Sequence, residues 1–242
     1  MRSINIFKIL ILRYQKKEEF ELSNNKKYLR EMGLDVEWYF ASNNKNSGKT
    51  LINLQDISAL RKKVMNCKIC NLSSTRKNSV FGEGNLESDI MIIGEAPGRE
   101  EDESGVPFVG RAGKLLDEIL FYLGLDRNKI FITNIVKCRP PENRNPLNEE
   151  ISACKNYLKE QISHIKPKLL ILLGKVAANS ILHKDMSMSD MRRRIFDRNE
   201  YDLPIFVLYH PAFILRSPLQ KKNLWEDIKF LENYIENGYS TP

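Results

Sequence analysis

The loop Gly94-Glu95-Ala96-Pro97-Gly98 has the residue types of a ligand pocket. It follows the apolar run Ile90-Met91-Ile92-Ile93, and a second glycine- and proline-containing stretch, Gly105 to Gly110, comes soon after it. These loops carry one carboxylate, Glu95, and one aromatic ring, Phe108. Such a pair suits a flat polar ligand, because the ring can stack on the ligand while polar groups bind its edge.

Two further apolar runs end in polar side chains. Asn134 comes near the end of the run that begins at Ile130, and His210 directly follows the run Ile205 to Tyr209. Ligands of open α/β sheets bind outside the carboxyl ends of the parallel strands. We therefore expect a carboxylate from Glu95, a carboxamide from Asn134 and an imidazole from His210 to meet at one edge of a sheet.

The four cysteines have a pattern that is compatible with a metal centre. Cys67 and Cys70 form a C-x-x-C pair, Cys138 follows an apolar run, and Cys154 lies in a predicted helix. Disulfides are rare in a reducing cytosol. Zinc and a cubane iron–sulfur cluster both accept four thiolates, and the spacing does not choose between them. The remaining alternative is four unrelated buried cysteines.

The elements that must position these residues follow from the apolar pattern. Four short apolar runs predict strands at Asp89 to Ile93, Ile130 to Val136, Lys168 to Leu173 and Ile205 to Tyr209. Helical spacing predicts helices at Leu54 to Val64, Leu115 to Leu123, from an Asn148 cap through Ile162, Lys175 to Leu182 and Asn223 to Ile235. Buried strands alternating with amphipathic helices imply an α/β fold, a three-layer αβα sandwich with a central four-stranded parallel sheet.

Length and composition indicate one folded domain with an amino-terminal extension. The chain has 242 residues, 42% of them apolar, which is enough for a full hydrophobic core. We place the boundary at residue 50. Residues 1–50 form an extension of unknown role with a short helix over Lys26 to Met32, and residues 51–242 form the domain. The formal charge of +7 favours a polyanionic partner.

The amino terminus bears on localisation. Met1 to Leu12 resembles a short signal sequence, but Lys8 interrupts the apolar run and no small-residue cleavage site follows. We therefore expect a cytoplasmic protein. No run approaches the roughly 18 apolar residues of a membrane-spanning helix, so we expect no membrane role.

Three stretches carry a resemblance to a known family. GEAPGREEDESGVPFVGRAGKLLDEIL, ITNIVKCRPPENRNP and HPAFILRSP, with the order C-x-x-C…C…C, closely resemble the family 4 uracil-DNA glycosylases, the iron–sulfur branch of their superfamily. The resemblance covers about residues 55 to 235. It implies a base excision repair enzyme that flips deoxyuridine out of DNA and hydrolyses its N-glycosidic bond, leaving an abasic site. It also implies a [4Fe-4S] cluster on Cys67, Cys70, Cys138 and Cys154.

The resemblance and the residue chemistry together assign a base pocket. Phe108 is placed to stack on the flipped uracil, with Glu95 and Ala96 beside it. The Asn134 amide can pair with uracil O4 and N3–H, whereas cytosine would meet the amide donor with a donor of its own. By analogy with the family, His210 donates a hydrogen bond to uracil O2 as negative charge develops on the leaving base.

Two more residues are assigned to catalysis beside His210. Glu95 can orient water, stabilise the oxocarbenium-like sugar or crowd C5 of thymine, and the sequence does not separate these roles. Asn143, in the loop Pro140 to Arg144, is a second candidate to position the attacking water.

DNA contacts are assigned to residues near the same motifs. Leu215 and Arg216 follow the histidine motif and are candidates for a wedge that enters the base stack. Candidates for phosphate contacts are Arg139 and Arg144, together with Arg111, Lys137 and Lys221. We expect a monomer that binds uracil-containing DNA, single- or double-stranded. A sliding clamp or a polymerase as protein partner is left open by the sequence.

Two other functions fit parts of the pattern. One is a non-catalytic iron–sulfur module that binds DNA or a polymerase and has kept the pocket. The other is an electron carrier, although the sequence has no compact ferredoxin-like run of cysteines. The joint presence of Glu95, Phe108, Asn134 and His210 favours the enzyme.

Overall fold

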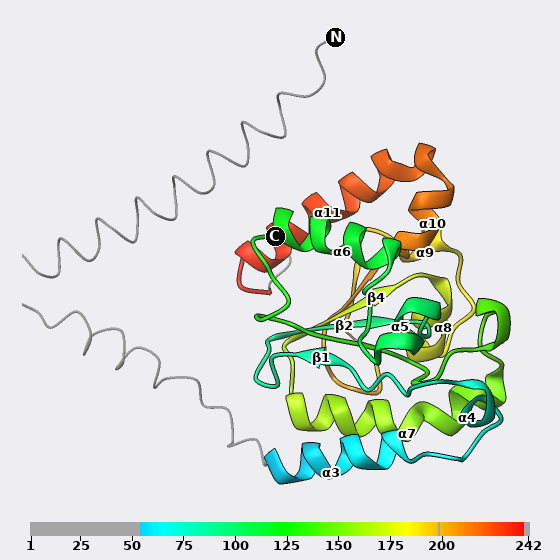
Figure 1. Cartoon of the computed structure of the whole chain (residues 1–242). Helices are drawn as coiled ribbons and strands as arrows, with labels where there is room; N and C mark the ends of the chain where they lie inside the picture. The colour runs from blue at the N-terminus through cyan, green and yellow to red at the C-terminus, as the bar shows by residue number, and fades with distance from the viewer. Residues whose placement is uncertain (1–53, 198, 240–242) are drawn as a thin grey trace, which may run out of the picture. The chain divides into compact units, whose positions relative to one another are not determined.

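A parallel sheet forms the centre of the molecule. The computed structural model describes residues 54–197 and 199–239, so the predicted extension and its helix over Lys26 to Met32 lie outside the described residues. Four parallel strands have the order β3-β2-β4-β6. They correspond to the four predicted strands and are β2 (Ile90–Gly94), β3 (Phe131–Asn134), β4 (Leu169–Leu173) and β6 (Ile205–Leu208) (Figure 1).

Two short antiparallel strands border this sheet. β1 (Glu83–Gly84) pairs with β3, and β5 (Ile195–Phe196) pairs with β6. The sequence analysis predicted neither strand, because two residues are too few to show the alternation from which a strand is predicted. The sheet therefore has six strands where four were expected.

Helices cover both faces of the sheet, which confirms the predicted three-layer αβα sandwich. The longer helices that contribute to the core on one face are α3 (Leu54–Met65), α7 (Asn148–Ile165) and α8 (Lys175–Leu182). Those that contribute on the other face are α6 (Arg111–Tyr122), α10 (Pro211–Arg216) and α11 (Lys221–Glu236). In Figure 1, α3 and α7 accordingly lie on one side of the sheet, and α6 and α11 lie on the opposite side.

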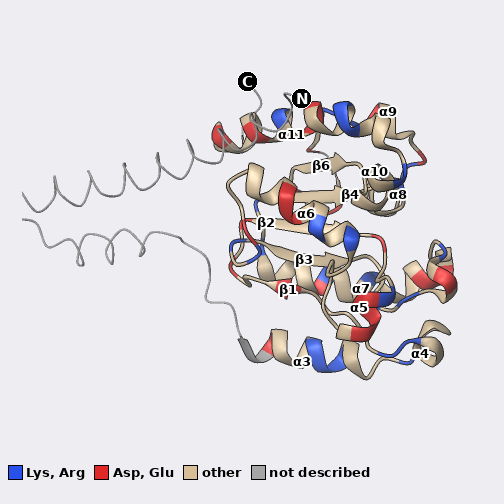
Figure 2. Cartoon of the chain, turned by 45° about the horizontal axis from the view of Figure 1, so that its top comes forward, with Lys and Arg blue, Asp and Glu red and all other residues tan. Residues whose placement is uncertain are grey.

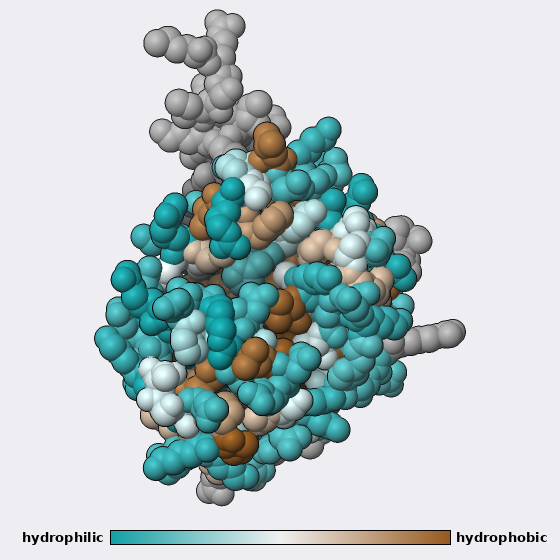
Figure 3. Space-filling view, turned by 90° about the vertical axis from the view of Figure 1, so that its right-hand side faces the viewer, coloured by the Kyte–Doolittle hydropathy of each residue, from teal (hydrophilic) through white to brown (hydrophobic). Residues whose placement is uncertain are grey.

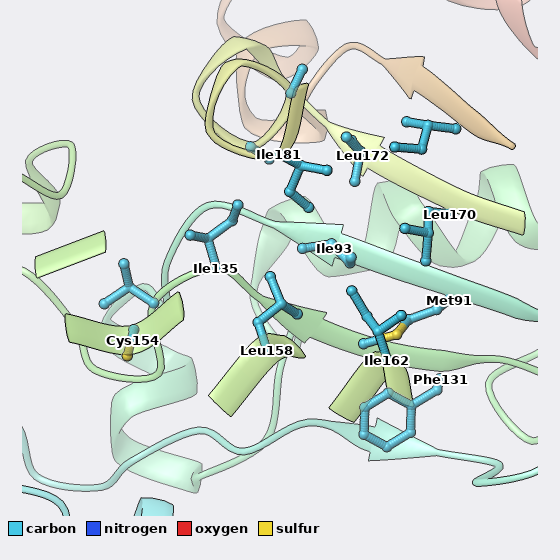
Figure 4. Close-up of a cluster of buried hydrophobic side chains, with 14 of the residues drawn as sticks. Met91, Ile93, Phe131, Ile135, Cys154, Leu158, Ile162, Leu170, Leu172 and Ile181 are labelled. Carbon is cyan, nitrogen blue, oxygen red and sulfur yellow. The ribbon is translucent and has the colours of Figure 1, made fainter. Parts of the chain in front are cut away.

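Alternate residues of β2 enter different cores. Met91 and Ile93 share a buried cluster with Leu158 of α7 (Figure 4). Ile90 and Ile92 belong to the cluster on the opposite face, with residues of α6 and α11. Successive side chains of a strand point to opposite faces, so a strand covered on both faces needs an unbroken apolar run.

The helix ends differ in part from the predictions. α7 begins at Asn148, but Asn148 is not its cap; the carboxylate of Glu150 accepts a hydrogen bond from Leu147 N–H at 2.7 Å instead. A glutamate three residues after the cap position often accepts this hydrogen bond at the amino terminus of a helix. The short elements that the sequence analysis did not predict are α4 (Leu72–Thr75), α5 (Arg99–Ser104), α9 (Met188–Met191), α10, and the 3₁₀ turns η1 (Pro141–Asn143) and η2 (Pro218–Gln220).

The helices of residues 54–197 and 199–239 bear on membrane crossing. None of them combines the length and the apolar character that crossing a bilayer requires.

Candidate active site and cysteine centre

The pairing of β2 with β3 brings the two central motifs together. In this parallel ladder Gly94 lies beside Asn134. Two further backbone hydrogen bonds extend the pairing beyond the strands, from Ile135 N–H to the Gly94 carbonyl at 2.9 Å and from Val136 N–H to the Glu95 carbonyl at 3.1 Å. The Glu95 loop is therefore fixed next to the end of β3.

A cleft with a volume of about 830 Å³ lies at this carboxyl edge of the sheet, within the usual range of small-molecule sites. In Figure 1, α5, α8 and α10 follow β2, β4 and β6 on this side. Figure 3 shows the same side, with apolar surface near the middle of a largely hydrophilic face. The predicted site residues that line the cleft are Glu95, Ala96, Phe108, Asn134, Asn143, Arg144, His210 and Arg216.

Asn134 presents an unsatisfied acceptor inside this cleft. The residue is 1% exposed, and its Oδ1 is the one buried side-chain nitrogen or oxygen without a hydrogen-bond partner among the described residues. A buried polar atom without a partner is costly and calls for an explanation, of which a missing ligand is one. A side chain at Gly94 would overlap both Asn134 Oδ1 and the Phe108 ring, so glycine is required for this packing.

Phe108 is held in a conformation that is unfavourable for an aromatic residue. Its φ is 53°, in the left-handed region, and its ring centroid lies 5.8 Å from that of His210 with an interplanar angle of 33°. Arg127 donates hydrogen bonds to the Pro107 carbonyl at 3.0 Å and to the Phe108 carbonyl. Glu101 Oε1 accepts from the N–H groups of Val109 and Gly110, each at 3.0 Å.

Glu101 also joins this loop to the one that follows β2. Its second carboxylate oxygen accepts from Gly98 N–H at 3.0 Å. The carboxylate of Glu101, in the acidic helix α5 (Figure 2), thus fixes the Glu95 loop and the Phe108 loop relative to each other. The sequence analysis did not single out Glu101. The signal was present, since Glu101 lies three residues after Gly98, where a glutamate can cap a helix.

The hydrogen bonding of His210 defines which ring nitrogen carries the proton. His210 is the cap residue of α10, and its Nδ1 accepts from Ala212 N–H at 3.2 Å. In the neutral ring the proton must then be on Nε2. Burial, together with the charge of Arg216, lowers the pKa of His210 to about 4. The imidazole is therefore a neutral hydrogen-bond donor at physiological pH.

The pKa of the Glu95 carboxyl group is shifted in the opposite direction, upward. Burial raises the pKa of Glu95 above its usual 4.5, and the nearby Arg216 guanidinium opposes this shift. A carboxylate whose pKa moves toward neutral pH is better suited to accept a proton than an exposed one.

The loop after β3 contains the remaining predicted catalytic and phosphate-binding residues. Asn143 has a φ of 56°, and its Oδ1 accepts from Arg139 Nε at 2.8 Å. Arg144 forms a two-pronged ion pair with Glu150, with N···O distances of 2.6 and 2.9 Å. Arg139 is not among the residues that line the cleft. Its hydrogen bond to Asn143 connects it to a residue that does line the cleft.

The predicted phosphate contact of Lys137 is wrong, because this side chain is buried. It is 1% exposed. Burial lowers the pKa of Lys137 to about 7, and the neighbouring Cys154 and Cys138 oppose the shift. Arg111 and Lys221 are exposed and stay predicted phosphate contacts.

The predicted wedge residues differ in their placement. Arg216 lines the cleft, whereas Leu215 does not and is 37% exposed. Leu219 in η2 is 93% exposed, more than any other large apolar side chain of the described residues. The sequence analysis missed Leu219, because the exposure of a leucine in a short turn leaves no periodic signal.

All four cysteines line one small cavity between the loop after α3, the segment after β3, and α7. Cys138 and Cys154 are buried, and Cys67 and Cys70 are half-buried. Two donors point at the sulfurs, Arg76 Nη1 at 2.8 Å from Cys138 Sγ and Lys137 N–H at 3.4 Å from Cys154 Sγ. In residues 54–197 and 199–239 no three His, Cys, Asp or Glu side chains are grouped closely enough to hold one metal ion. A set of four cysteines fits a four-iron cluster, in which each iron is bound by a separate thiolate.

The comparison with known proteins agrees with this geometry. Residues 81–232 match the family model of the Uracil DNA glycosylase superfamily. The chain belongs to this superfamily. It is 45% identical over 192 residues to a type-4 uracil-DNA glycosylase of Saccharolobus solfataricus, covering 76% of this chain and 88% of that protein. It is 42% identical over 183 residues to the type-4 uracil-DNA glycosylase of Sulfurisphaera tokodaii, covering 73% and 83%. The corresponding protein of Pyrobaculum aerophilum is 41% identical over 179 residues, covering 72% and 91%.

These relatives confirm the family resemblance that the motifs indicated. For this member of the uracil-DNA glycosylase superfamily, the matched region includes both pocket loops, the Asn134 strand end and the histidine motif. The roles of the individual site residues stay predictions.

His210 should remain neutral in the folded protein down to acidic pH. Its pKa is lowered from 6.5 to about 4, so between these values the folded protein binds fewer protons than the unfolded chain. The free energy of unfolding should therefore fall as the pH drops from about 6.5 toward 4. NMR titration of the imidazole measures the pKa directly, and His210→Asn should remove this contribution to the pH dependence. Titration of His210 near 6.5 in the folded protein would contradict this assignment.

Glu101→Gln should loosen both pocket loops. The amide has one acceptor oxygen where the carboxylate has two, so at least one of the three backbone N–H groups loses its partner. We expect a loss of about 1–3 kcal/mol in the free energy of unfolding and faster hydrogen exchange at Val109 and Gly110. Glu103→Gln, an exposed change on the same helix, is the matched control. Equal exchange rates in the two variants would show that Glu101 does not hold the loop.

Proposed function

We propose that this chain is a monofunctional uracil-DNA glycosylase that hydrolyses the N-glycosidic bond of a flipped deoxyuridine. The observation that carries the proposal is the buried, unpaired Oδ1 of Asn134 in a cleft shared with Phe108 and His210. Five relatives of 37–45% identity are named type-4 uracil-DNA glycosylases, which favours this activity over a non-catalytic module or an electron carrier.

Base recognition follows from the hydrogen-bonding groups of Asn134. The unpaired Oδ1 requires a donor, which uracil supplies at N3–H, while the amide nitrogen donates to uracil O4. Cytosine presents an unprotonated N3 to the acceptor and an amino group to the donor, so both contacts fail. Mismatches of this kind can discriminate by about 10⁴ or more. Phe108 supplies the stacking surface, and Ala96 lines the same cleft.

Bond cleavage requires stabilisation of the uracil anion that leaves. Neutral His210 donates from Nε2 to uracil O2, where negative charge builds up. A preorganised donor of this kind is typically worth about 3–4 kcal/mol. Glu95 and Asn143 line the cleft and act on the water and the sugar. Glu95 does so as a carboxylate, which stabilises the cationic sugar and accepts a proton from the water.

The four cysteines hold a [4Fe-4S] cluster. They line one cavity, and hydrogen-bond donors face two of their sulfurs. The name of the type-4 relatives supports the same branch of the superfamily. When bound, the cluster cross-links the loop after α3, the segment after β3, and α7. It serves the structure near the DNA-facing surface.

DNA is the macromolecular partner, bound at the mouth of the cleft. Arg216 lines the cleft, and Leu219 follows one turn later with 93% of its surface exposed. Leu219 therefore joins Leu215 as a candidate wedge for the base stack. Arg139 and Arg144 contact phosphates in this proposal. The monomeric state, the cytoplasmic localisation and a clamp or polymerase partner stay predictions from the sequence.

An oligonucleotide with one uracil and a labelled end tests the activity. The iron-loaded protein should produce an alkali-labile site at the uracil in U:G, U:A or single-stranded DNA. Asn134→Ala and His210→Ala should each lower kcat/KM by about 10²–10³. Asn128→Ala, in an exposed loop, serves as the matched control. Binding of uracil DNA without any strand break would favour the non-catalytic module and reject the glycosylase.

The acid limb of the pH–rate profile should report Glu95. Because its pKa is raised, the carboxylate is protonated and activity is lost as the pH falls through a value above 4.5. Protonation of His210, with a pKa of about 4, occurs only at lower pH. Glu95→Gln should lower the rate and remove this limb of kcat/KM. A limb of unchanged position in Glu95→Gln would assign it to another group.

Leu219→Ala should reduce excision from duplex DNA more than from single strands. A wedge helps to unstack a base, and a single-stranded substrate needs this help least. Parallel measurements on Leu215→Ala rank the two candidates, and Leu147→Ala, an exposed leucine at the start of α7, is the control. An equal effect of Leu219→Ala on both substrates would exclude a wedge.

A further inference from the structure

Lys137 lies between the two centres of the molecule. In the chain it comes three residues after Asn134 and directly before Cys138. Its Nζ donates hydrogen bonds to Thr133 Oγ1 at 2.7 Å, to the Asn134 carbonyl at 2.6 Å and to Gln161 Oε1 at 2.6 Å. A residue that the sequence assigns to the surface is thus anchored in the interior.

The geometry at Nζ is that of an ammonium ion. Three acceptors lie within hydrogen-bond distance, and an ammonium has three protons to donate. All three acceptors are neutral oxygens. Among the described residues no carboxylate forms an ion pair with Lys137. A buried cation without an anion costs several kcal/mol, so the site needs a compensating negative charge.

The four-cysteine centre adjoins Lys137 and can supply that charge. Cys138 follows Lys137 in the chain, and Cys154 Sγ accepts the hydrogen bond from Lys137 N–H at 3.4 Å. Lys137 itself lines the cavity that the four cysteines share. Cysteines that bind a metal do so as thiolates, which are anionic.

Lys137 also stabilises the end of β3, the strand that carries Asn134. Gln161, its partner on α7, donates from Nε2 to the Phe81 carbonyl at 2.7 Å, and Thr133 Oγ1 donates to the same carbonyl at 2.8 Å. The Nζ bond to the Asn134 carbonyl is therefore part of a closed network between β3, α7 and the segment before β1. Within this network the backbone of Asn134 has little freedom.

We propose that Lys137 is a positioning residue that couples the four-cysteine centre to the uracil-reading Asn134. The thiolates of the loaded centre compensate the buried ammonium, and the ammonium holds the Asn134 backbone in the orientation that binds uracil. This inference rests on the proposed function, because it concerns the site at which uracil binds. Coupling of this kind is reciprocal, so bound uracil must also stabilise the centre.

The test measures whether bound uracil protects the four-cysteine centre of the iron-loaded protein. Calorimetry first establishes binding of free uracil. An iron chelator is then added, and the loss of visible absorbance is followed with and without saturating uracil. If iron leaves through an opened form that does not bind uracil, saturating uracil should slow the release of iron from the wild type by about fivefold or more. In Lys137→Met, which keeps the length of the side chain but not its charge, uracil should bind more weakly and this protection should be lost.

Two further variants serve as a control and as an alternative to Lys137→Met. Lys155→Met, on a half-exposed lysine next to Cys154, should behave as the wild type. If Lys137→Met does not load iron, Gln161→Leu removes one of the three acceptors and keeps the charge, and it should reduce the protection in part. Uracil binding with equal protection in the wild type and in the lysine or glutamine variant would overturn the coupling. Absence of uracil binding to the wild type would instead reject the proposed function.

Discussion

The pairing of β2 with β3 is the constraint on which the site depends. Its register places Gly94 beside Asn134, and the segments that follow the two strands supply one part of the cleft lining, from Glu95 to Gly98 and from Pro140 to Asn145. A shift by one residue would turn each side chain of a strand to the opposite face. The site also requires glycine at position 94. A Cβ at this position would overlap both the Asn134 amide and the Phe108 ring.

The cleft is built in advance of its ligand. Phe108 is kept at a positive φ by Glu101 on one side and Arg127 on the other, and the Asn134 acceptor stays unpaired. Each of these features lowers the stability of the protein without ligand. In the proposed function these features are in place before the flipped base binds, and preorganisation of this kind reduces the cost of binding.

The sequence predicted the parts of the structure that leave a local pattern. The four parallel strands appear as apolar runs, and Glu95, Asn134 and His210 could be assigned to one edge because parallel strands end together. β1 and β5 have no such pattern, since their two residues are defined by their partners.

Long-range contacts explain the remaining errors. Lys137 resembles any basic residue near a DNA-binding motif until the packing of α7 against β3 shows that it is buried. Glu101 is one acid among four in α5, and its role depends on the N–H groups of a loop that comes later in the chain. Leu219 differs from other leucines only in its exposure.

We claim that the Asn134 carboxamide reads the base, and a crystal structure of the protein with free uracil tests this claim. The claim predicts uracil N3 within hydrogen-bond distance of Asn134 Oδ1, uracil O2 at His210 Nε2, and the ring stacked on Phe108. Uracil bound elsewhere in the cleft, with Asn134 Oδ1 still unpaired, would contradict it.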